Sequence, residues 1–386
     1  MDVEIRKVVS RSDLKKFVGF PFLLYKGNKF WCPPLKFDEF NTLREDKNPA
    51  FEYCEAAYFI AYCNNRPVGR IAGIINLKEV ERWQVKLVRF GWFDFIDDLR
   101  ISGQLLEAVR AWGHSRGMTG MHGPLGFTDM DPEGMMMEGF DELSSLSAIY
   151  NFPYYPEHMV NLGFKKATDW VQFKIRVPDH IPEKVERMAR MVLSKYDLRL
   201  LSPRKANDIL PYAGKLFTMY NEAFRDLYGF TALTSKQIDT YTKQYFGFIR
   251  AEFVSIIVDG KDDVIGFGIT MPSLAKALQK ANGSLFPFGF YHLLHALRKN
   301  DMVHMYLVGI RPDYQGKGIL ALVYNELTRA YMNAGLKLAI THPQLEENLK
   351  AVSIWKNYDG KVHIRRRCWI KAVSYTHLTL PTTERV

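Results

Sequence analysis

The stretch 309-GIRPDYQGKGIL-320 joins an apolar segment to an amphipathic one, and the prediction of the fold starts from it. Before it, residues 303–310 are rich in β-branched and aromatic side chains, which predicts a buried strand. After it, apolar side chains recur at helical spacing from Ile319 to Leu327, and Gly335 suits the position just past a helix end. The loop between them therefore leads from a strand to a helix N-terminus.

This loop has features of a phosphate-binding site. Gly316 and Gly318 lack the Cβ atoms that would hinder a close approach of the backbone to a ligand. Amide groups at a helix N-terminus point outward at the positive end of the helix dipole, so the backbone alone can hold a pyrophosphate. The pattern matches neither the nucleotide P-loop nor G-x-G-x-x-G. A plain connection between strand and helix is the alternative.

The composition predicts a globular protein with two cores of ordinary size. The chain has 386 residues, 47% of them hydrophobic. Its four cysteines form no C-x-x-C pair and no zinc spacing, so we expect neither a disulfide framework nor a metal site. The beginning, "MDVEIRKVV", is charged where a signal peptide is apolar, and no segment reaches membrane-spanning length. We therefore expect a soluble, cytoplasmic protein without a membrane partner.

The net charge of +10 indicates an anionic ligand or a solvated basic surface. We do not expect a nucleic acid as partner, because the sequence has no recognisable nucleic-acid-binding module. An anionic cofactor, held at the loop before Ile319, is the interpretation that the glycines favour.

Both halves of the chain present the same order of elements. Each begins with a short strand and a helix, continues with a hairpin (residues 56–76 and 251–271), and ends with a strand, a helix and further strands. Two prolines and several charges separate the halves at residues 178–184. The sequence predicts an α+β fold of two domains, residues 1–177 and 185–372, each with a central mixed sheet flanked by helices.

The last residues differ in character from the rest. "VSYTHLTLPTT", residues 373–383, resembles an in-frame translation of a sequencing adapter. We interpret residues 373–386 as an artefactual tail and leave them out of the fold.

The loop resembles the acyl-CoA-binding loop of the GNAT acyltransferase superfamily, whose pattern is Q/R-x-x-G-x-G/A. Gln315 and Gly318 match this pattern, whereas Leu320 occupies its last position; the side chain of Leu320 can turn into the core beside Val323 and leave its amide free. The segments "KLAITH" and "EENLKAVSIWKNY" that follow also resemble the superfamily, with Asn348 matching an asparagine that contacts CoA.

The first half resembles a second GNAT domain that has lost the cofactor loop. "YYPEHMVNLGFKKATDW", residues 154–170, is similar to the C-terminal part of such domains, but "DDLRISGQ" keeps a helix start without the glycines. The resemblance implies an N-acetyltransferase, in which an acetyl group moves from acetyl-CoA, or another acyl group from its acyl-CoA, to a small-molecule or peptide amine without a metal. The cofactor-binding residues that it implies are Val308, Ile310, Gln315, Gly316, Lys317, Gly318, Ile319, Leu320 and Asn348.

For the chemistry we expect a general base and a stabilised oxyanion. His304 lies on the predicted strand where some GNAT enzymes carry a base carboxylate, and strand alternation places it on one face with Tyr306 and Val308. His304 and Tyr306 are therefore the candidate catalytic residues, and the amide near Val308 the candidate oxyanion donor. The alternative for His304 is a histidine packed in the sheet.

The usual acid of the superfamily is absent. Trp355 stands where many members carry a tyrosine, and an indole cannot protonate a thiolate. Tyr358 lies one turn further on, where core packing is the alternative to a catalytic role. The thiolate can also leave unassisted or be protonated by water.

A long aromatic and acidic stretch in the first half, residues 126–142, suggests where the acceptor binds. We expect it to face the acyl site, with Asp129, Asp131 and Glu133 attracting a cationic amine. An ordinary surface loop is the alternative. Two further functions stay open: an acyl-CoA-binding sensor or scaffold without catalysis, and a Fem-type aminoacyl transferase, although the helical-hairpin arm of that class is missing.

Overall fold

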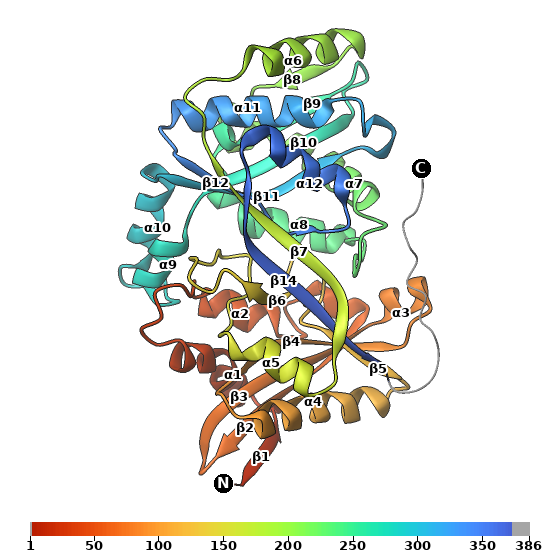
Figure 1. Cartoon of the computed structure of the whole chain (residues 1–386), viewed down its shortest axis with the longest axis vertical. Helices are drawn as coiled ribbons and strands as arrows, with labels where there is room; N and C mark the ends of the chain where they lie inside the picture. The colour runs from red at the N-terminus through yellow and green to blue at the C-terminus, as the bar shows by residue number, and fades with distance from the viewer. Residues whose placement is uncertain (1, 373–386) are drawn as a thin grey trace.

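The computed structural model describes residues 2–372, which share one mixed, 14-stranded sheet. The molecule has two lobes: the first is built around strands β1 to β5 and the second around strands β8 to β12, with β7 and β14 between them. The main path of the sheet runs in the order β1-β2-β3-β4-β5-β14-β7-β12-β11-β10-β9-β8, and helices cover the sheet in both lobes (Figure 1). The artefactual tail predicted at residues 373–386 lies outside the described residues. The observed architecture confirms the predicted α+β class with mixed sheets.

The first half of the chain supplies the elements up to β7. They are β1 (Val3–Lys7), α1 (Arg11–Leu24), α2 (Lys36–Thr42), β2 (Cys54–Cys63), β3 (Arg66–Asn76), α3 (Leu77–Trp83), β4 (Leu87–Phe95), α4 (Leu99–His114), β5 (Gly120–Gly123), β6 (Met135–Glu138), α5 (Tyr154–Asn161) and β7 (Lys165–Arg176). The turn between β2 and β3 uses Asn64 and Asn65, whose φ angles of 49° and 59° suit asparagine in a tight hairpin.

The second half supplies the remaining elements. They are α6 (Glu183–Lys195), β8 (Arg199–Leu201), α7 (Leu210–Ala223), α8 (Ser235–Tyr245), β9 (Val254–Val258), β10 (Val264–Pro272), α9 (Ala275–Ala281), α10 (Gly289–Arg298), β11 (Met302–Ile310), α11 (Ile319–Asn333), β12 (Leu338–Ile340), β13 (Gln344–Leu345), α12 (Leu349–Val352) and β14 (Lys361–Ala372). The strand and the helix expected on either side of the QGKG loop are β11 and α11.

The two halves exchange their last strands. β7 pairs with β12 of the second half, and β14 pairs with β5 of the first. β7 and β14 also pair with each other and run side by side between the lobes (Figure 1). Accordingly, Trp369 of β14 is buried in the core of the first lobe, whereas Phe173 and Ile175 of β7 are buried in that of the second. Each lobe therefore needs a strand from the other half of the chain.

The strands β11 and β12 diverge, and this opens the sheet. They pair in parallel only at residues 302–304 with 338–340, while β11 stays paired with β10 as far as Ile310. The chain after β12 instead follows β7 through β13. A shift of register, at which Thr270 faces Met305 and Ile269 faces Leu307, marks a β-bulge at Tyr306. From residue 305 onward, one edge of β11 is thus free to face a ligand.

Candidate functional site

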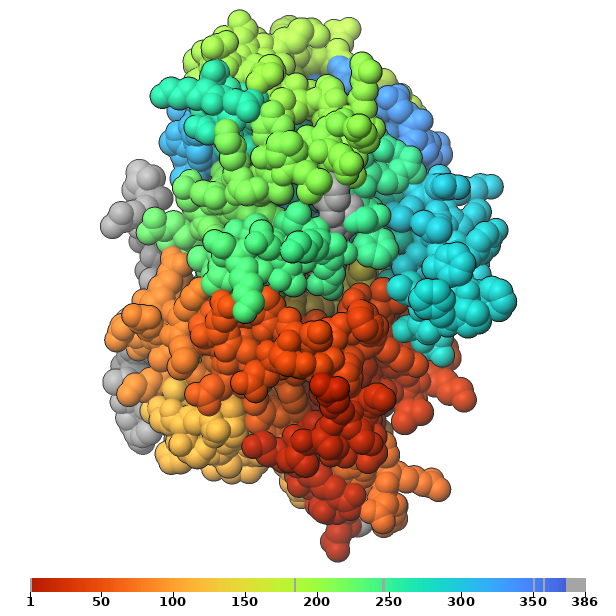
Figure 2. Space-filling model, turned by 180° about the vertical axis from the view of Figure 1, so that it is seen from behind, coloured from red at the N-terminus to blue at the C-terminus, as the bar shows by residue number. Residues whose placement is uncertain are grey.

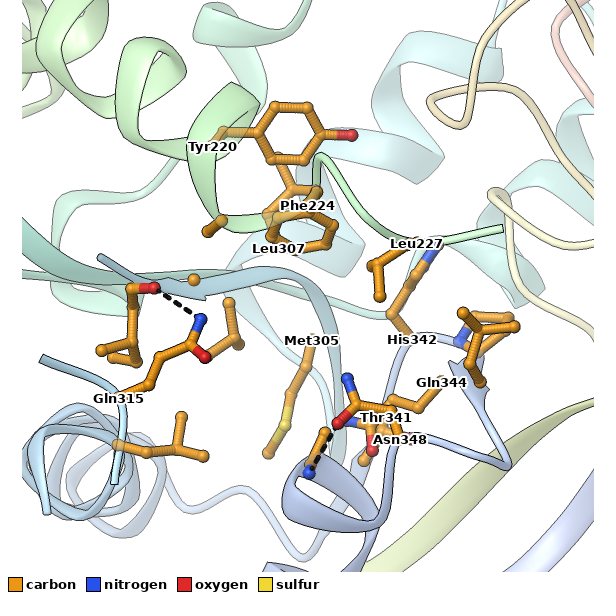
Figure 3. A pocket seen from close by; sticks show the side chains of 18 of the residues that line it. Tyr220, Phe224, Leu227, Met305, Leu307, Gln315, Thr341, His342, Gln344 and Asn348 are labelled. Atoms are coloured by element: carbon orange, nitrogen blue, oxygen red, sulfur yellow. Dashed lines mark hydrogen bonds between the residues drawn. The ribbon is translucent and has the colours of Figure 1, made fainter. Parts of the chain in front are cut away.

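A cavity of about 560 Å³ occupies the opening between β11 and the segment that follows β12. Residues 305–310 and 341–345 form its walls, and the C-terminal end of α7 with residues 224–230 covers it. In Figure 3, Tyr220, Phe224 and Leu227 lie above Met305, with Gln315 and Asn348 on either side. Residues of both lobes reach the cavity, because Asp129, Glu133 and Trp170 also line it.

The QGKG loop lies at the Gln315 side of this cavity. Gly316 and Gly318 have φ angles of 76° and 82°, a region that favours glycine, and a Cβ on Gly316 would meet nothing within 4 Å. Helix α11 begins at Ile319 without a side-chain cap, so its first amides have no partner from a capping side chain. Gln315 donates from Nε2 to the carbonyl of Ile310 at 3.3 Å, which ties the loop to the end of β11. The result is a helix N-terminus that can accept an anionic group.

Most of the predicted cofactor residues meet in the cavity. Those that line it are Val308, Ile310, Gln315, Gly316, Gly318, Ile319, Leu320 and Asn348, together with Tyr306. Leu320 also packs against the core cluster that contains Val323. Asn348 caps α12 by accepting a hydrogen bond from the amide of Ala351 at 3.3 Å. The ammonium group of Lys317 lies 4.8 Å from the ring centre of Tyr314, and Lys317 does not line the cavity.

His304 lies behind the cavity wall. Its side chain is buried, its Nδ1 has no hydrogen-bond partner among the described residues, and it is not among the lining residues. Burial, with a smaller effect of His363, lowers the pKa of His304 to about 4, which makes it a weak base. The β-bulge at Tyr306 interrupts the strand alternation that was expected to place His304 on one face with Tyr306 and Val308, and these two residues line the cavity without it. The position of His304 therefore matches the alternative of a histidine packed in the sheet.

Trp355 and Tyr358 belong to the core of the second lobe. Trp355 is 1% exposed, and its Nε1 donates to Oε1 of Gln344 at 2.8 Å. Tyr358 packs against Trp355 and Tyr324, and neither Trp355 nor Tyr358 lines the cavity. Neither is placed to protonate a leaving group there.

Two of the three predicted acids reach the cavity from the first lobe. Asp129 accepts a hydrogen bond from the hydroxyl group of Tyr220, while its Oδ1 has no partner among the described residues. Burial raises the pKa of Asp129 to about 6 and that of Glu133 well above its ordinary value. Asp131 points elsewhere, because its carboxylate accepts the amides of Phe127 and Thr128 at 2.9 and 3.1 Å. An acidic pair, rather than a trio, thus faces the opening.

A buried chain of polar groups leads away from the cavity into the first lobe. The hydroxyl group of Tyr228, a lining residue, lies 2.8 Å from Nδ1 of His122. On its other side, Nε2 of His122 lies 3.6 Å from Glu79, which pairs with Arg89 at 2.8 Å. Burial raises the pKa of Glu79, but Arg89 and His122 outweigh burial and lower it to about 2. The group next to His122 is therefore a fixed carboxylate.

The sequence did not predict this series of polar groups, because its members come from separate segments. Glu79 belongs to α3, Arg89 to β4 and His122 to β5, while Tyr228 lies on the loop after α7. Arg89 also donates to the carbonyl of Gly229 at 2.7 Å, which holds the Tyr228 loop against the first lobe. Only the packing of the lobes brings these groups together.

The described residues contain no cluster of three or more histidine, cysteine, aspartate or glutamate side chains suited to a metal ion. The parts described above, a helix N-terminus, one free strand edge, an acidic pair and a buried Tyr–His–Glu series, make up the candidate site.

Comparisons with known proteins give distant relatives and a structural match. No family model matches the sequence. The chain is 27% identical over 314 residues to Protein YghO of Escherichia coli (strain K12). The match covers 81% of this chain and 79% of that protein. The chain is also 24% identical over 381 residues to the bacterial ceramide synthase of Caulobacter vibrioides (strain NA1000 / CB15N), covering 96% and 98%.

Among solved structures, a tandem GNAT protein from the clavulanic acid biosynthesis pathway matches with a TM-score of 0.56. The match covers 97% of this chain and 100% of that one at 11% sequence identity. This likeness concerns the fold alone, and it extends over both lobes.

Proposed function

We propose, from the tandem GNAT fold of this chain, that it is an acyltransferase that moves an acyl group from acyl-CoA to an amine. The observation that carries the proposal is one shared cavity, in which the helix N-terminus at Gly318 and the acids of the first lobe both lie. The name of one relative, bacterial ceramide synthase, supports the proposal that the acyl group is transferred to nitrogen and that the donor need not be acetyl-CoA.

The donor would bind along the free edge of β11. The first amides of α11 would hold the pyrophosphate, and the strand edge from Met305 to Ile310, unpaired with β12, would hold the amide-containing arm. A backbone amide near Val308 is our candidate donor to the oxygen of the thioester carbonyl, where negative charge develops. This part of the site would bind and orient the donor, and most of the residues that line it are cofactor-binding candidates of the sequence analysis.

The acceptor would enter on the side of Asp129 and Glu133. Two acidic side chains in a cavity favour a cationic amine, and burial raises the pKa of Asp129 to about 6 and that of Glu133 well above its ordinary value, which makes each a better proton acceptor than an exposed carboxylate. Among the described residues Glu133 has no ion-pair partner, so a bound ammonium group would supply the missing countercharge. Glu133 is therefore our candidate for removing the first proton from the amine.

Tyr228 is our candidate for receiving the second proton. As the amine nitrogen forms its bond to the carbonyl carbon, the proton on that nitrogen passes to the oxygen of Tyr228, and the tyrosine's own proton passes to Nδ1 of His122. Glu79 stabilises the resulting imidazolium. The carbon–sulfur bond then breaks, and the thiolate leaves with a proton from this relay or from water.

The activity is tested by incubating the purified chain with acyl-CoAs of increasing length and a panel of amines, while free thiol and product mass are followed. We expect thiol release that depends on the amine. A protein that binds acyl-CoA without amine-dependent release would instead be a sensor, the alternative that the buried Trp355 favours.

The roles of the acids and of the relay are separated by two variants. Asp129→Asn with Glu133→Gln should raise the acceptor KM about tenfold or more and leave the KM of acyl-CoA unchanged, because only the acceptor loses its countercharge. Asp131→Asn serves as the matched control, since Asp131 lies outside the cavity.

Tyr228→Phe should lower kcat by about 100-fold with little change in either KM, because it removes a proton path rather than a contact. An unchanged kcat in Tyr228→Phe would remove the relay from the mechanism.

A further inference from the structure

The segment from Met271 to Asn300 exposes a concentrated set of aromatic side chains. Phe286, Phe288 and Tyr291 are 78%, 72% and 62% exposed, and Phe290 and Leu294 are exposed as well. The described residues include five exposed large aromatic side chains, and four of them, Phe286, Phe288, Phe290 and Tyr291, are in this segment. In Figure 2 the segment, coloured blue-green, protrudes at the edge of the molecule above the red first helices. Such a concentration on one protruding element marks an interaction surface.

The fold itself does not use these side chains. Helix α10 packs Gly289, Leu293 and Leu297 inward, against a cluster that includes Leu274 and Leu278. Its opposite face, which carries Phe290, Tyr291 and Leu294, is therefore the second apolar surface of the helix. A helix that is apolar on its outer face as well keeps that face for a partner.

The fifth exposed aromatic residue, Phe37, extends the same surface from the first lobe. It follows Lys36, whose amide donates to the carbonyl of Gly283 at 2.9 Å. Nearby, Nε2 of Gln279 donates to the carbonyl groups of Lys29 and Trp31, each at 2.9 Å. The loop between α1 and α2 is thus fastened to α9, and we call the combined surface, formed by α9, α10, residues 282–288 and residues 26–37, the aromatic face.

The charges on the aromatic face have one sign. Residues 271–300 contain no aspartate or glutamate, and their cations Lys276, Lys280, Arg298 and Lys299 are exposed. The adjoining loop adds three exposed lysines, Lys26, Lys29 and Lys36. Aromatic side chains surrounded by lysine and arginine fit the boundary between the headgroups and acyl chains of an anionic bilayer.

We propose that the aromatic face docks this protein onto the surface of a membrane that contains anionic lipid, a partner that the sequence analysis did not expect. None of the helices in residues 2–372 combines the length and the apolar character needed to cross a bilayer, so the contact would be peripheral. A second copy of the chain fits the face less well, because a twofold contact would place like charges opposite each other. The inference rests on these surface residues alone and does not depend on the acyl-transfer proposal.

The test is flotation of the full chain with vesicles of phosphatidylcholine, alone or mixed with phosphatidylglycerol. We expect binding to the mixed vesicles that decreases as salt is raised, and at least tenfold weaker binding to phosphatidylcholine alone. The variant Phe286→Ser, Phe288→Ser, Tyr291→Ser should lose the binding. Met188→Ser with Met191→Ser is the matched control, because these exposed apolar residues lie on α6, outside the aromatic face.

Two results would overturn the proposal. One is a wild-type chain that stays with the soluble fraction in the presence of phosphatidylglycerol vesicles at low salt. The other is self-association, measured by sedimentation, that the triple serine variant abolishes while vesicle binding stays unchanged, which would assign the face to a second copy. Circular dichroism of the variants separates a lost surface from a lost fold.

Discussion

Gly318 combines two requirements at the start of α11. Its φ of 82° favours glycine, and its amide belongs to the helix N-terminus where the pyrophosphate would bind. A Cβ there would lie 3.0 Å from Cγ2 of Val192, so any side chain has a cost in packing. The informative comparison is therefore between two substitutions of equal size.

We predict that Gly318→Asp loses CoA binding by at least on the order of 100-fold, or ~3 kcal/mol, relative to Gly318→Asn. Both variants carry the same strain, but only aspartate places a negative charge against the pyrophosphate. Calorimetric titration with CoA measures the difference. Equal affinities in the two variants would mean that the phosphates bind elsewhere.

His304 gives a prediction about stability and pH. Burial lowers its pKa to about 4, whereas a histidine in the unfolded chain has a pKa of about 6.5. Between these values the unfolded chain binds a proton that the folded chain does not. The stabilising effect of a neutral His304 is therefore complete above about pH 6.5 and is lost as the pH falls toward 4.

Between pH 7 and pH 5, the free energy of unfolding should decrease by roughly 2 kcal/mol less in His304→Leu than in the wild type. Urea unfolding at the two pH values measures it, with His114→Leu, an exposed position at the end of α4, as the control. If His304→Leu has the same pH dependence as the wild type, His304 is not the buried neutral group described here.

The residues of the site differ in how far the sequence could predict them. That Gln315, Gly316 and Gly318 lie together between β11 and α11 was predictable because they are neighbours in the chain, and a local motif determines local geometry; their role in binding the donor stays a prediction. His304 was a candidate because it lies where some GNAT enzymes carry a base carboxylate, and strand alternation grouped it with Tyr306 and Val308; a single bulge at Tyr306 interrupts that alternation. Tyr228 and His122 are 106 positions apart, and no local pattern connects them.

At the scale of elements, the order along the chain was predictable but the pairing was not. Hairpins such as β2–β3 follow from alternation and turn residues, which are local signals. The exchange of β7 and β14 depends on contacts between residues as distant as Trp369 and Gly123, and alternation within a strand does not specify its neighbour. Both halves consequently looked self-contained in the sequence, although each contributes a strand to the other.

The exchanged strand β14 gives the prediction at this scale. A chain that ends at residue 360 would leave the edges of β5 and β7 without their common neighbour and would remove Trp369 from the core of the first lobe. We expect this truncation to lose cooperative unfolding of the first lobe and to aggregate.

The matched control is a chain that ends at Ala372, which keeps β14 and removes only the predicted artefactual tail. Its melting temperature should equal that of the full chain. If the chain that ends at residue 360 is soluble and keeps the near-ultraviolet circular dichroism of the wild type, β14 is not essential to the first lobe.

At the scale of the whole molecule, one sheet joins the first lobe to the second, in which the QGKG loop precedes α11. β14 and β7 lie between β5 and β12, so hydrogen bonding continues from the first lobe to the second without an interruption. The first lobe also supplies Asp129 and Glu133 to the cavity, and its His122 contacts the lining residue Tyr228. The fold of the first lobe therefore helps to build the site, even though it lacks the glycines.

This continuity predicts that the chain unfolds as one unit and that a ligand of the second lobe stabilises both. Under the proposed function CoA binds only the folded state, so it should raise the melting temperature of a single calorimetric transition, and saturation at 100 times Kd should contribute about 2.7 kcal/mol. Hydrogen exchange followed by mass spectrometry should show added protection in β4 and β5 of the first lobe as well as in β11 and α11. Two separate transitions, of which CoA moves only one, would show that the shared sheet does not couple the lobes and that the first lobe serves the site only through the side chains that it places there.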